Sequence, residues 1–289
     1  MSYSNYYVQM AEAKNRAETK REWHADICEY YNVTPELALQ LGTRSDGRKP
    51  SLPGSKTCEP VSDMTMEDIW ALKPRETVSD IHDFYRDQGA WSAFRQTVRH
   101  LELAEMRKNV MSQLVSNGMH FVEYGCGIAP FTTTLLENMD PSWDVDVSLT
   151  DVDKCEHYLY GQWVLDRLKD RRSLERVNIN AVPAVPDSLP KYHKKIDALV
   201  IFEVQEHLPS PVAALKNIMD QMNPNALIVE NFVKHVHDHD EEDDPGCDLA
   251  SAAEERGEYY RLLDEHFTLV AGTPEYEAPN ATRIWVKKA

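Results

Sequence analysis

Seven short apolar runs, several of them separated by segments of helical character, occupy the chain from Met119 to its last residues. Strands that alternate with helices at this spacing favour a mostly parallel sheet, because parallel neighbours need a long crossover between them. The crossovers place helices on both faces of such a sheet. The runs lie at residues 120–125, 146–151, 176–182, 197–203, 226–232, 266–272 and 282–288. The sequence therefore predicts an α/β fold with a seven-stranded sheet.

The last two runs are joined by only TPEYEAPN, which leaves no room for a helix. They should pair as an antiparallel hairpin, so that the last strand runs against the rest of the sheet. The clearest helix is expected over residues 210–222, because its apolar residues share one face. These residues are Val212, Leu215, Ile218, Met219 and Met222.

Residues 1–110 precede the sheet and are predicted to form a helical extension, with a second domain over 111–289. Thr34 followed by Pro35 has the form of an N-cap with proline in the first helical position. The Gly-, Pro- and Ser-rich residues 42–60 are the best loop candidate in the chain. Tyr85, Trp91 and Phe94 could stack on a substrate, or simply pack a helical cap onto the sheet.

A glycine turn follows the first strand, in the sequence Phe121-Val-Glu-Tyr-Gly-Cys-Gly-Ile-Ala-Pro. Ligands of parallel α/β sheets bind at the carboxyl ends of the strands, and glycine there allows positive φ and a close approach. A dinucleotide fold would use GxGxxG to hold a pyrophosphate. Glu123 would repel that anion but suits a cationic ligand that carries an amino group.

Asp151 ends the second apolar run, 24 residues after Gly127. A carboxylate in this position accepts hydrogen bonds from the ribose hydroxyls of a bound nucleoside, as in dinucleotide-binding folds. The glycine turn is weak evidence when taken alone. The turn, the acid one strand later and the seven runs together are much more specific.

With these features, residues 119–288 resemble a class I S-adenosylmethionine-dependent methyltransferase. Glu123-x-Gly125-x-Gly127 matches the family's glycine motif, and Asp151 matches its ribose-binding acid. The segment from Ile196 resembles the fourth strand and the helix after it. The third glycine of the motif is replaced by Ala129, which Pro130 follows.

The resemblance implies a Rossmann-like fold with a helical N-terminal cap, and it implies S-adenosylmethionine as cofactor. By the resemblance, Gly125 and Gly127 pack against the methionine part and Asp151 holds the ribose. Glu123 would lie near the amino acid part of the cofactor or a water molecule that bridges to it. Hydrophobic and small residues would line the rest of the cofactor site. The expected set there is Cys126, Val152 beside the adenine, Ala181 after the third strand, and Phe202.

Glu203-Val-Gln-Glu-His207 follows the fourth strand, at the edge of the sheet where chemistry is expected. In one interpretation His207 is a general base, since its ordinary pKa suits proton removal near neutral pH. In a second, Glu203, Glu206 and His207 bind a divalent metal with a further ligand from residues 235–244. In the third, which weighs most, these residues are structural. A metal is therefore not favoured.

The formal net charge of −17 disfavours a nucleic-acid partner, because the chain as a whole repels phosphate. No apolar run reaches the roughly 20 residues that span a bilayer, and no secretory signal is recognised. Five scattered cysteines are typical of a reducing compartment, so a cytoplasmic location is expected. The oligomeric state cannot be read from the sequence.

The sequence thus predicts a methyltransferase acting on a small-molecule or sugar-like acceptor, with O-methylation preferred because of His207. Two alternatives stay open. One is a metal-assisted RNA 2′-O-methyltransferase, and the other is a catalytically inactive cofactor-binding scaffold.

Overall fold

The computed structural model describes residues 21–42, 77–102, 104–233, 249–274 and 281–289. The expected loop at 42–60 and the acidic, histidine-rich residues 235–244 therefore lie almost wholly or wholly outside the described residues. The helices are α2 (Arg21–Tyr31), α3 (Pro35–Gly42), α5 (Val78–Asp87), α6 (Ala90–Glu102), α7 (Ala104–Leu114), α8 (Pro130–Asn138), α9 (Glu156–Arg171), the short 3₁₀ helix η1 (Gln205–His207), α10 (Pro211–Gln221) and α11 (Ala250–His266).

Seven strands form one sheet in the order β3-β2-β1-β4-β5-β7-β6. β7 pairs antiparallel with both β5 and β6, and the other pairings are parallel. The predicted fold class, including the antiparallel last strand, is confirmed. The strands are β1 (His120–Tyr124), β2 (Val145–Thr150), β3 (Val177–Ala181), β4 (Ile196–Phe202), β5 (Met222–Asn231), β6 (Phe267–Ala271) and β7 (Arg283–Lys287).

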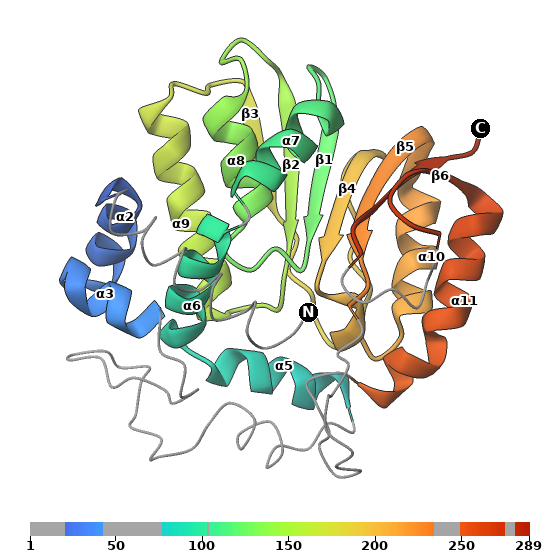
Figure 1. The fold of residues 1–289 in the computed structure, drawn as a ribbon, viewed down its shortest axis with the longest axis horizontal. Helices are drawn as coiled ribbons and strands as arrows, with labels where there is room; N and C mark the ends of the chain where they lie inside the picture. Colours follow the sequence, from blue (N-terminus) through green and yellow to red (C-terminus); the bar gives the residue numbers. More distant parts are fainter. Residues whose placement is uncertain (1–20, 43–76, 103, 234–248, 275–280) are drawn as a thin grey trace.

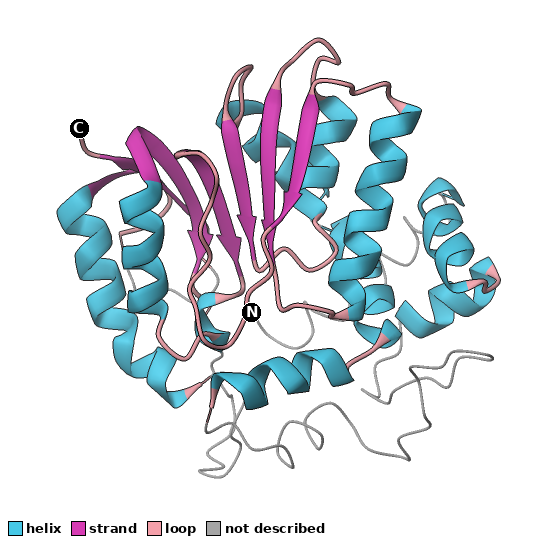
Figure 2. Ribbon diagram, turned by 180° about the vertical axis from the view of Figure 1, so that it is seen from behind, coloured by secondary structure: helices cyan, strands magenta, loops and turns pink. Residues whose placement is uncertain are grey.

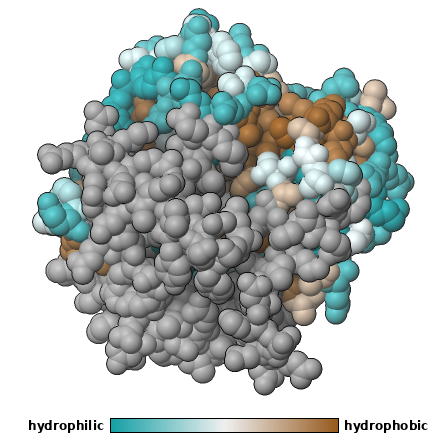
Figure 3. All heavy atoms as spheres, viewed as in Figure 1, coloured by the Kyte–Doolittle hydropathy of each residue, from teal (hydrophilic) through white to brown (hydrophobic). Residues whose placement is uncertain are grey.

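Helices cover both faces of the sheet (Figures 1 and 2). On one face α10 and α11 bury a core with alternate residues of the central strands, among them Leu199 and Ile228. On the other face α7, α8 and α9 pack against Val147 and Val200. Figure 3 shows apolar surface gathered over β4 and β5 on this second face. Leu227 of β5 and Ile284 of β7, which pack against this second core, are accordingly only partly buried.

The connection between β3 and β4, residues 182–195, contains no helix. Pro183, Pro186 and Pro190 explain this, since proline lacks the N–H that a helix interior requires. Instead the segment covers polar groups of the sheet: Tyr192 Oη lies 3.0 Å from Thr150 Oγ1. The regular strand–helix alternation expected from the sequence is broken at this crossover.

A buried ionic group links β5, β7 and α11. Glu230 and Arg283 are fully buried, with Arg283 Nη1 lying 3.7 Å from Glu230 Oε1. The backbone N–H of Phe232 and the indole N–H of Trp285 also donate to the Glu230 carboxylate. Tyr260 accepts a hydrogen bond from Arg283 at 2.9 Å. The two charges therefore have several polar partners away from water.

The N-terminal helices lie in two places. α2 and α3 pack beside α6 and α9, and Arg171 of α9 pairs with Asp26 of α2 at 3.1 Å. α5 instead runs across the end of the sheet toward which the parallel strands point (Figures 1 and 2). Ile81 and Phe84 of α5 are each only 4% exposed and join the core beneath α10 and α11. α5 is therefore part of the wall at the carboxyl edge of the sheet.

Candidate functional site

The turn between β1 and α8 uses three positive φ angles. They are 65° at Gly125, 53° at Gly127 and 56° at Ala129. The turn is tied to β2, because the N–H of Cys126 donates to the carbonyl of Thr150 at 3.0 Å. Glycine adopts positive φ angles at no steric cost, whereas a residue with a Cβ is strained there. The turn therefore brings bare backbone to the carboxyl edge of the sheet.

Both glycines are closely approached by side chains from other elements. A Cβ added at Gly125 would lie 2.1 Å from Val204 Cγ2, and one at Gly127 would lie 2.2 Å from Gln96 Oε1. The Gln96 side chain also accepts a hydrogen bond from the N–H of Ile128 at 3.1 Å. Helix α6 and the segment after β4 therefore meet at the glycine turn.

Glu123 has a different place from the one the resemblance implied. Its side chain is 2% exposed, and its two oxygens accept from the N–H groups of Phe131 and Thr132 and from the Thr132 hydroxyl. These donors lie in the first turn of α8, where backbone N–H groups lack helical partners. Burial raises the pKa of Glu123 to about 7, although these hydrogen bonds act against the rise. The carboxylate thus anchors α8 rather than facing the open edge.

Asp151 lies directly beside the glycine turn. Its Oδ2 accepts a hydrogen bond of 2.6 Å from the N–H of Gly127, and its Oδ1 accepts one of 2.7 Å from the N–H of Val152. Burial alone would raise the pKa of Asp151, but His157 and these N–H groups hold it below its ordinary value. The end of β2 therefore carries an ionised carboxylate next to bare backbone.

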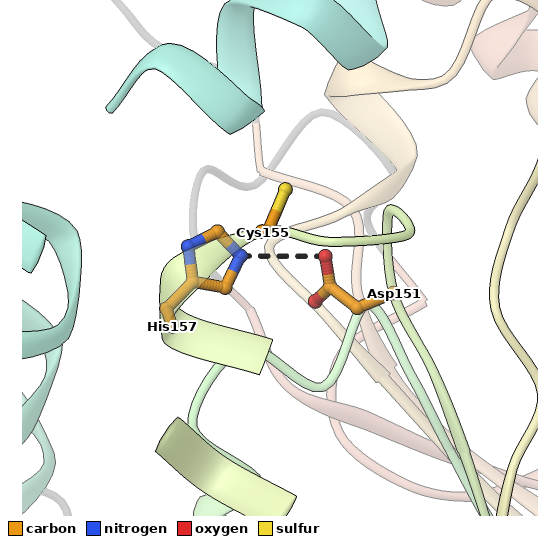
Figure 4. A group of neighbouring side chains, drawn as sticks. All are labelled: Asp151, Cys155 and His157. Carbon is orange, nitrogen blue, oxygen red and sulfur yellow. Dashed lines mark hydrogen bonds and ion pairs between the residues drawn. The ribbon is translucent and has the colours of Figure 1, made fainter. Parts of the chain in front are cut away.

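Figure 4 shows His157 and Cys155 gathered around Asp151. His157 Nε2 lies 3.4 Å from Asp151 Oδ1, and His157 Nδ1 lies 2.9 Å from the hydroxyl of Ser92. Ligand atoms of Asp151, Cys155 and His157 lie within 4.8 Å of one another. Burial is the main cause that raises the pKa of the Cys155 thiol, and Asp151 adds to the rise.

His82 of α5 places a further polar group at this edge. Its side chain is 6% exposed, and no described residue provides a hydrogen-bond partner for Nδ1. Burial lowers the pKa of His82, and nearby Arg86 lowers it further, while Asp151 and Asp83 act in the opposite direction. A buried ring nitrogen without a partner costs free energy, so it marks a place where a ligand atom can bind.

The residues after β4 are held in a strained turn. Glu203 has a φ of 56°, and its N–H donates to Asn231 Oδ1 at 2.7 Å. Glu206 is 1% exposed, and His207 retains 22% side-chain exposure beside the ring of Tyr85, whose centroid lies 6.2 Å away. A non-glycine residue in this backbone region is typical of functional sites, where the surroundings enforce the strain.

The metal interpretation of this segment gains nothing from the geometry. Among the described residues, the metal-ligating side chains that converge are Asp151, Cys155 and His157, and not Glu203, Glu206 and His207. The further ligands expected from residues 235–244 lie outside the part of the chain that the structure describes.

The remaining expected cofactor residues surround the same edge less closely. Cys126 is buried inside the glycine turn, and Phe202 packs on Phe131 with ring centroids 5.5 Å apart. Val152 is half-buried beside Asp151 and forms a bridge to Ala184. Ala181 is exposed at the end of β3, one strand farther out.

Sequence reasoning missed Gln96, His82, Ser92 and His157. Helix α6 contributes Gln96 and Ser92, and their spacing of four residues puts them on one face of the helix. His157 follows Asp151 by six residues at the start of a helix, which was the one readable signal. The side chain of Trp91 lies outside the description, and Phe94 is buried in the α2–α6–α9 core.

No helix among the described residues is long and apolar enough to cross a membrane.

A family model described as a methyltransferase domain matches residues 97–269. No curated protein matches the sequence.

Solved structures with a similar fold include the following three, each at low sequence identity. An O-methyltransferase from Bacillus cereus is 16% identical, with a TM-score of 0.41, 64% of this chain covered and 80% of that one. The pyocyanin biosynthetic protein PhzM is 14% identical, with a TM-score of 0.44 and coverages of 74% and 62%. The O-methyltransferase TomG from Streptomyces achromogenes is 8% identical, with a TM-score of 0.39 and coverages of 64% and 79%.

Proposed function

The chain belongs to the family of S-adenosylmethionine-dependent methyltransferase domains, and on this premise we propose that it methylates an oxygen atom of a small-molecule or sugar-like acceptor. The family sets the reaction class and the cofactor. The acceptor, the methylated atom and the residues that act on them are the proposal.

The hydrogen bond between Gly127 and Asp151 is the observation that carries the cofactor site. It puts an ionised carboxylate and a bare glycine backbone side by side at the carboxyl edge of the sheet. Asp151 would accept from ribose hydroxyls, as acids at this position do in related nucleotide-binding folds. The open Nδ1 of His82 would serve another polar atom of the same ligand.

The bound cofactor supplies a methyl group on a positively charged sulfur. The transfer is an in-line displacement, so the protein's contribution is to position the acceptor and exclude water. Gly125, Gly127, Cys126, Val152 and Phe202 would shape the cradle. Glu123 would act indirectly, because it fixes the start of α8 beneath the turn.

His207 is the proposed general base. It follows β4 at the carboxyl edge and is partly exposed, as a group that meets an acceptor must be. A hydroxyl acceptor must lose its proton as the methyl group arrives, and histidine is suited to this near neutral pH. This need favours O-methylation over transfer to an amine that is already nucleophilic.

The helical extension within residues 1–110 is proposed to form the acceptor cap. α5 lies across the carboxyl edge, with Tyr85 beside His207 and the Arg86 side chain donating to the carbonyl of Asp153 at 3.0 Å. A helix in this position limits the size of an acceptor and shields it from water. The net charge of −17 further favours a small acceptor over a nucleic acid.

The test is to incubate the protein with isotope-labelled S-adenosylmethionine and a metabolite extract, and to identify labelled products by mass spectrometry. We expect products one methyl group heavier, with the label on oxygen. His207→Ala should lower turnover at saturating cofactor while S-adenosylhomocysteine binds as before. Full activity in that variant would remove the base role, and label on nitrogen or carbon would remove O-methylation.

A further inference from the structure

Asp151 is held by a short relay, here meaning two successive side-chain hydrogen bonds, which begins at Ser92 in helix α6 and runs through His157. The hydroxyl of Ser92 lies 2.9 Å from Nδ1 of His157, and Nε2 of the same ring lies 3.4 Å from Asp151 Oδ1. Ser92 and His157 are 3% exposed each, so the relay is shielded from water. Ser92 belongs to α6, His157 to α9 and Asp151 to the end of β2.

The direction of the hydrogen bond to Asp151 follows from chemistry. An ionised carboxylate only accepts, so His157 Nε2 carries a proton and donates it to Oδ1. Nδ1 then faces a hydroxyl that can donate or accept, so the ring can keep this orientation. Ser92 Oγ also lies 2.9 Å from the carbonyl of Gly89, so its one hydrogen is donated either to that carbonyl or to Nδ1 of His157.

The two oxygens of Asp151 are occupied unequally. Oδ1 accepts from the N–H of Val152 and from His157, which fills its two lone-pair directions. Among the residues that the structure describes, Oδ2 accepts only from the N–H of Gly127. One acceptor site on Oδ2 is therefore left, on a side chain that is 11% exposed.

We propose that His157 is a positioning residue, which occupies Oδ1 of Asp151 and so turns Oδ2 toward a ribose hydroxyl of S-adenosylmethionine. This inference rests on the cofactor role proposed for Asp151. Ser92 holds the imidazole ring, so α6 takes part in cofactor binding without touching the ribose. Gln96 on the same helix bonds the N–H of Ile128, which gives α6 a second contact with the glycine turn.

The test compares two ligands, S-adenosylhomocysteine and its 2′,3′-dideoxyribose analogue, by calorimetry. The ratio of their dissociation constants measures what the ribose hydroxyls contribute. We expect a ratio of about tenfold or more for the unaltered protein, as for a hydrogen bond to a charged group. In the His157→Phe variant the ratio of the two dissociation constants should fall to about three or less. The reason is that S-adenosylhomocysteine loses affinity, whereas the analogue without ribose hydroxyls does not.

Two further variants separate positioning from general loosening of the fold. His157→Gln keeps an N–H donor near the place of Nε2 and should restore most of the ratio. His120→Phe is the matched control, since His120 is also a buried histidine with two hydrogen bonds, to Lys195 O and Ser148 Oγ, at the opposite end of β1. It should lower the unfolding temperature and leave the ratio unchanged.

The results that overturn the inference are distinct from those that overturn the cofactor site. If His157→Phe weakens both ligands equally or neither, His157 does not position Asp151. If the unaltered protein binds neither ligand, or Asp151→Asn leaves the ratio unchanged, the proposed cofactor role fails first. A cobalt(II)–thiolate absorption band that disappears in Cys155→Ser would assign the cluster of Figure 4 to a metal, and would also overturn the inference.

Discussion

Gly127 and Asp151 are joined by a hydrogen bond of 2.6 Å, in which the backbone N–H of the glycine donates to Oδ2 of the carboxylate. This contact links the turn after β1 to the end of β2. The two features from which the sequence predicted a cofactor site therefore lie within one small region of the fold.

Asp151→Ala should weaken the binding of S-adenosylhomocysteine by about 1–3 kcal/mol, because the ribose loses a charged acceptor. Titration calorimetry measures the change directly. Asp153→Asn is a suitable control, since Asp153 is close in sequence and its carboxylate lies 3.9 Å from the exposed side chain of Lys154. Equal affinities of Asp151→Ala and the control would contradict the ribose role.

Gly125→Ala should destabilise the fold more than Gly118→Ala. Both glycines have positive φ, 65° and 85°, but a Cβ at Gly118 would meet nothing within 4 Å. Gly118→Ala thus measures backbone strain alone, about 1–2 kcal/mol, whereas overpacking against Val204 adds about 1–3 kcal/mol at Gly125. Urea denaturation of both variants provides the comparison. Adding Val204→Ala to Gly125→Ala should recover part of the extra loss of unfolding free energy. If nothing is recovered, the contact with Val204 is not the cause of that loss.

Glu123→Gln should change how stability depends on pH. Burial raises the pKa of Glu123 from 4.5 to about 7, so the fold favours the protonated carboxyl. Its contribution is complete below about pH 4.5 and is lost as the pH rises through about 7, a loss of about 3 kcal/mol. The unfolding free energy of the unaltered protein, relative to Glu123→Gln, should therefore fall between pH 4.5 and 8. A constant difference across this range would argue against the raised pKa.

Arg283→Met should cost about 3–5 kcal/mol, because it leaves the buried Glu230 carboxylate without its cationic partner. Combining it with Glu230→Gln should recover part of the loss, since no charge then remains to be buried. Arg261→Met is the exposed comparison. Arg261 pairs with Glu258 at 2.6 Å on the surface of α11, where solvent screens the charges, so its loss should cost much less than that of Arg283. Equilibrium unfolding in denaturant measures all three proteins.

The sheet could be predicted from the sequence because its strands are nearly continuous apolar runs. Leu199 and Val200, for example, are adjacent residues that are buried on opposite faces. Such a run is typical of a parallel strand covered on both sides. The hairpin of β6 and β7 followed from the short connection. The helix-free crossover before β4 was not foreseen, although three prolines in residues 183–190 give its physical reason.

The site was only partly predictable, because motif position does not fix side-chain direction. Glu123 stands next to the glycine turn in sequence, yet the unpaired N–H groups at the start of α8 attract its carboxylate inward. Ser92 reaches His157 only because α6 and α9 pack together, a contact between residues 65 apart in sequence. A local sequence pattern does not predict a tertiary contact of this kind.

The placement of α5 has a consequence for how the protein can be divided. The segment that relatives share begins at residue 97, after α5 and within α6. Ile81 and Phe84, however, are buried in the same core as Trp285 near the other end of the chain. A fragment that begins at residue 97 would expose part of that core to water. It would also lack Ser92, which lies within hydrogen-bond distance of His157. The segment that matches the family model and the buried core of the described residues therefore begin at different places in the chain.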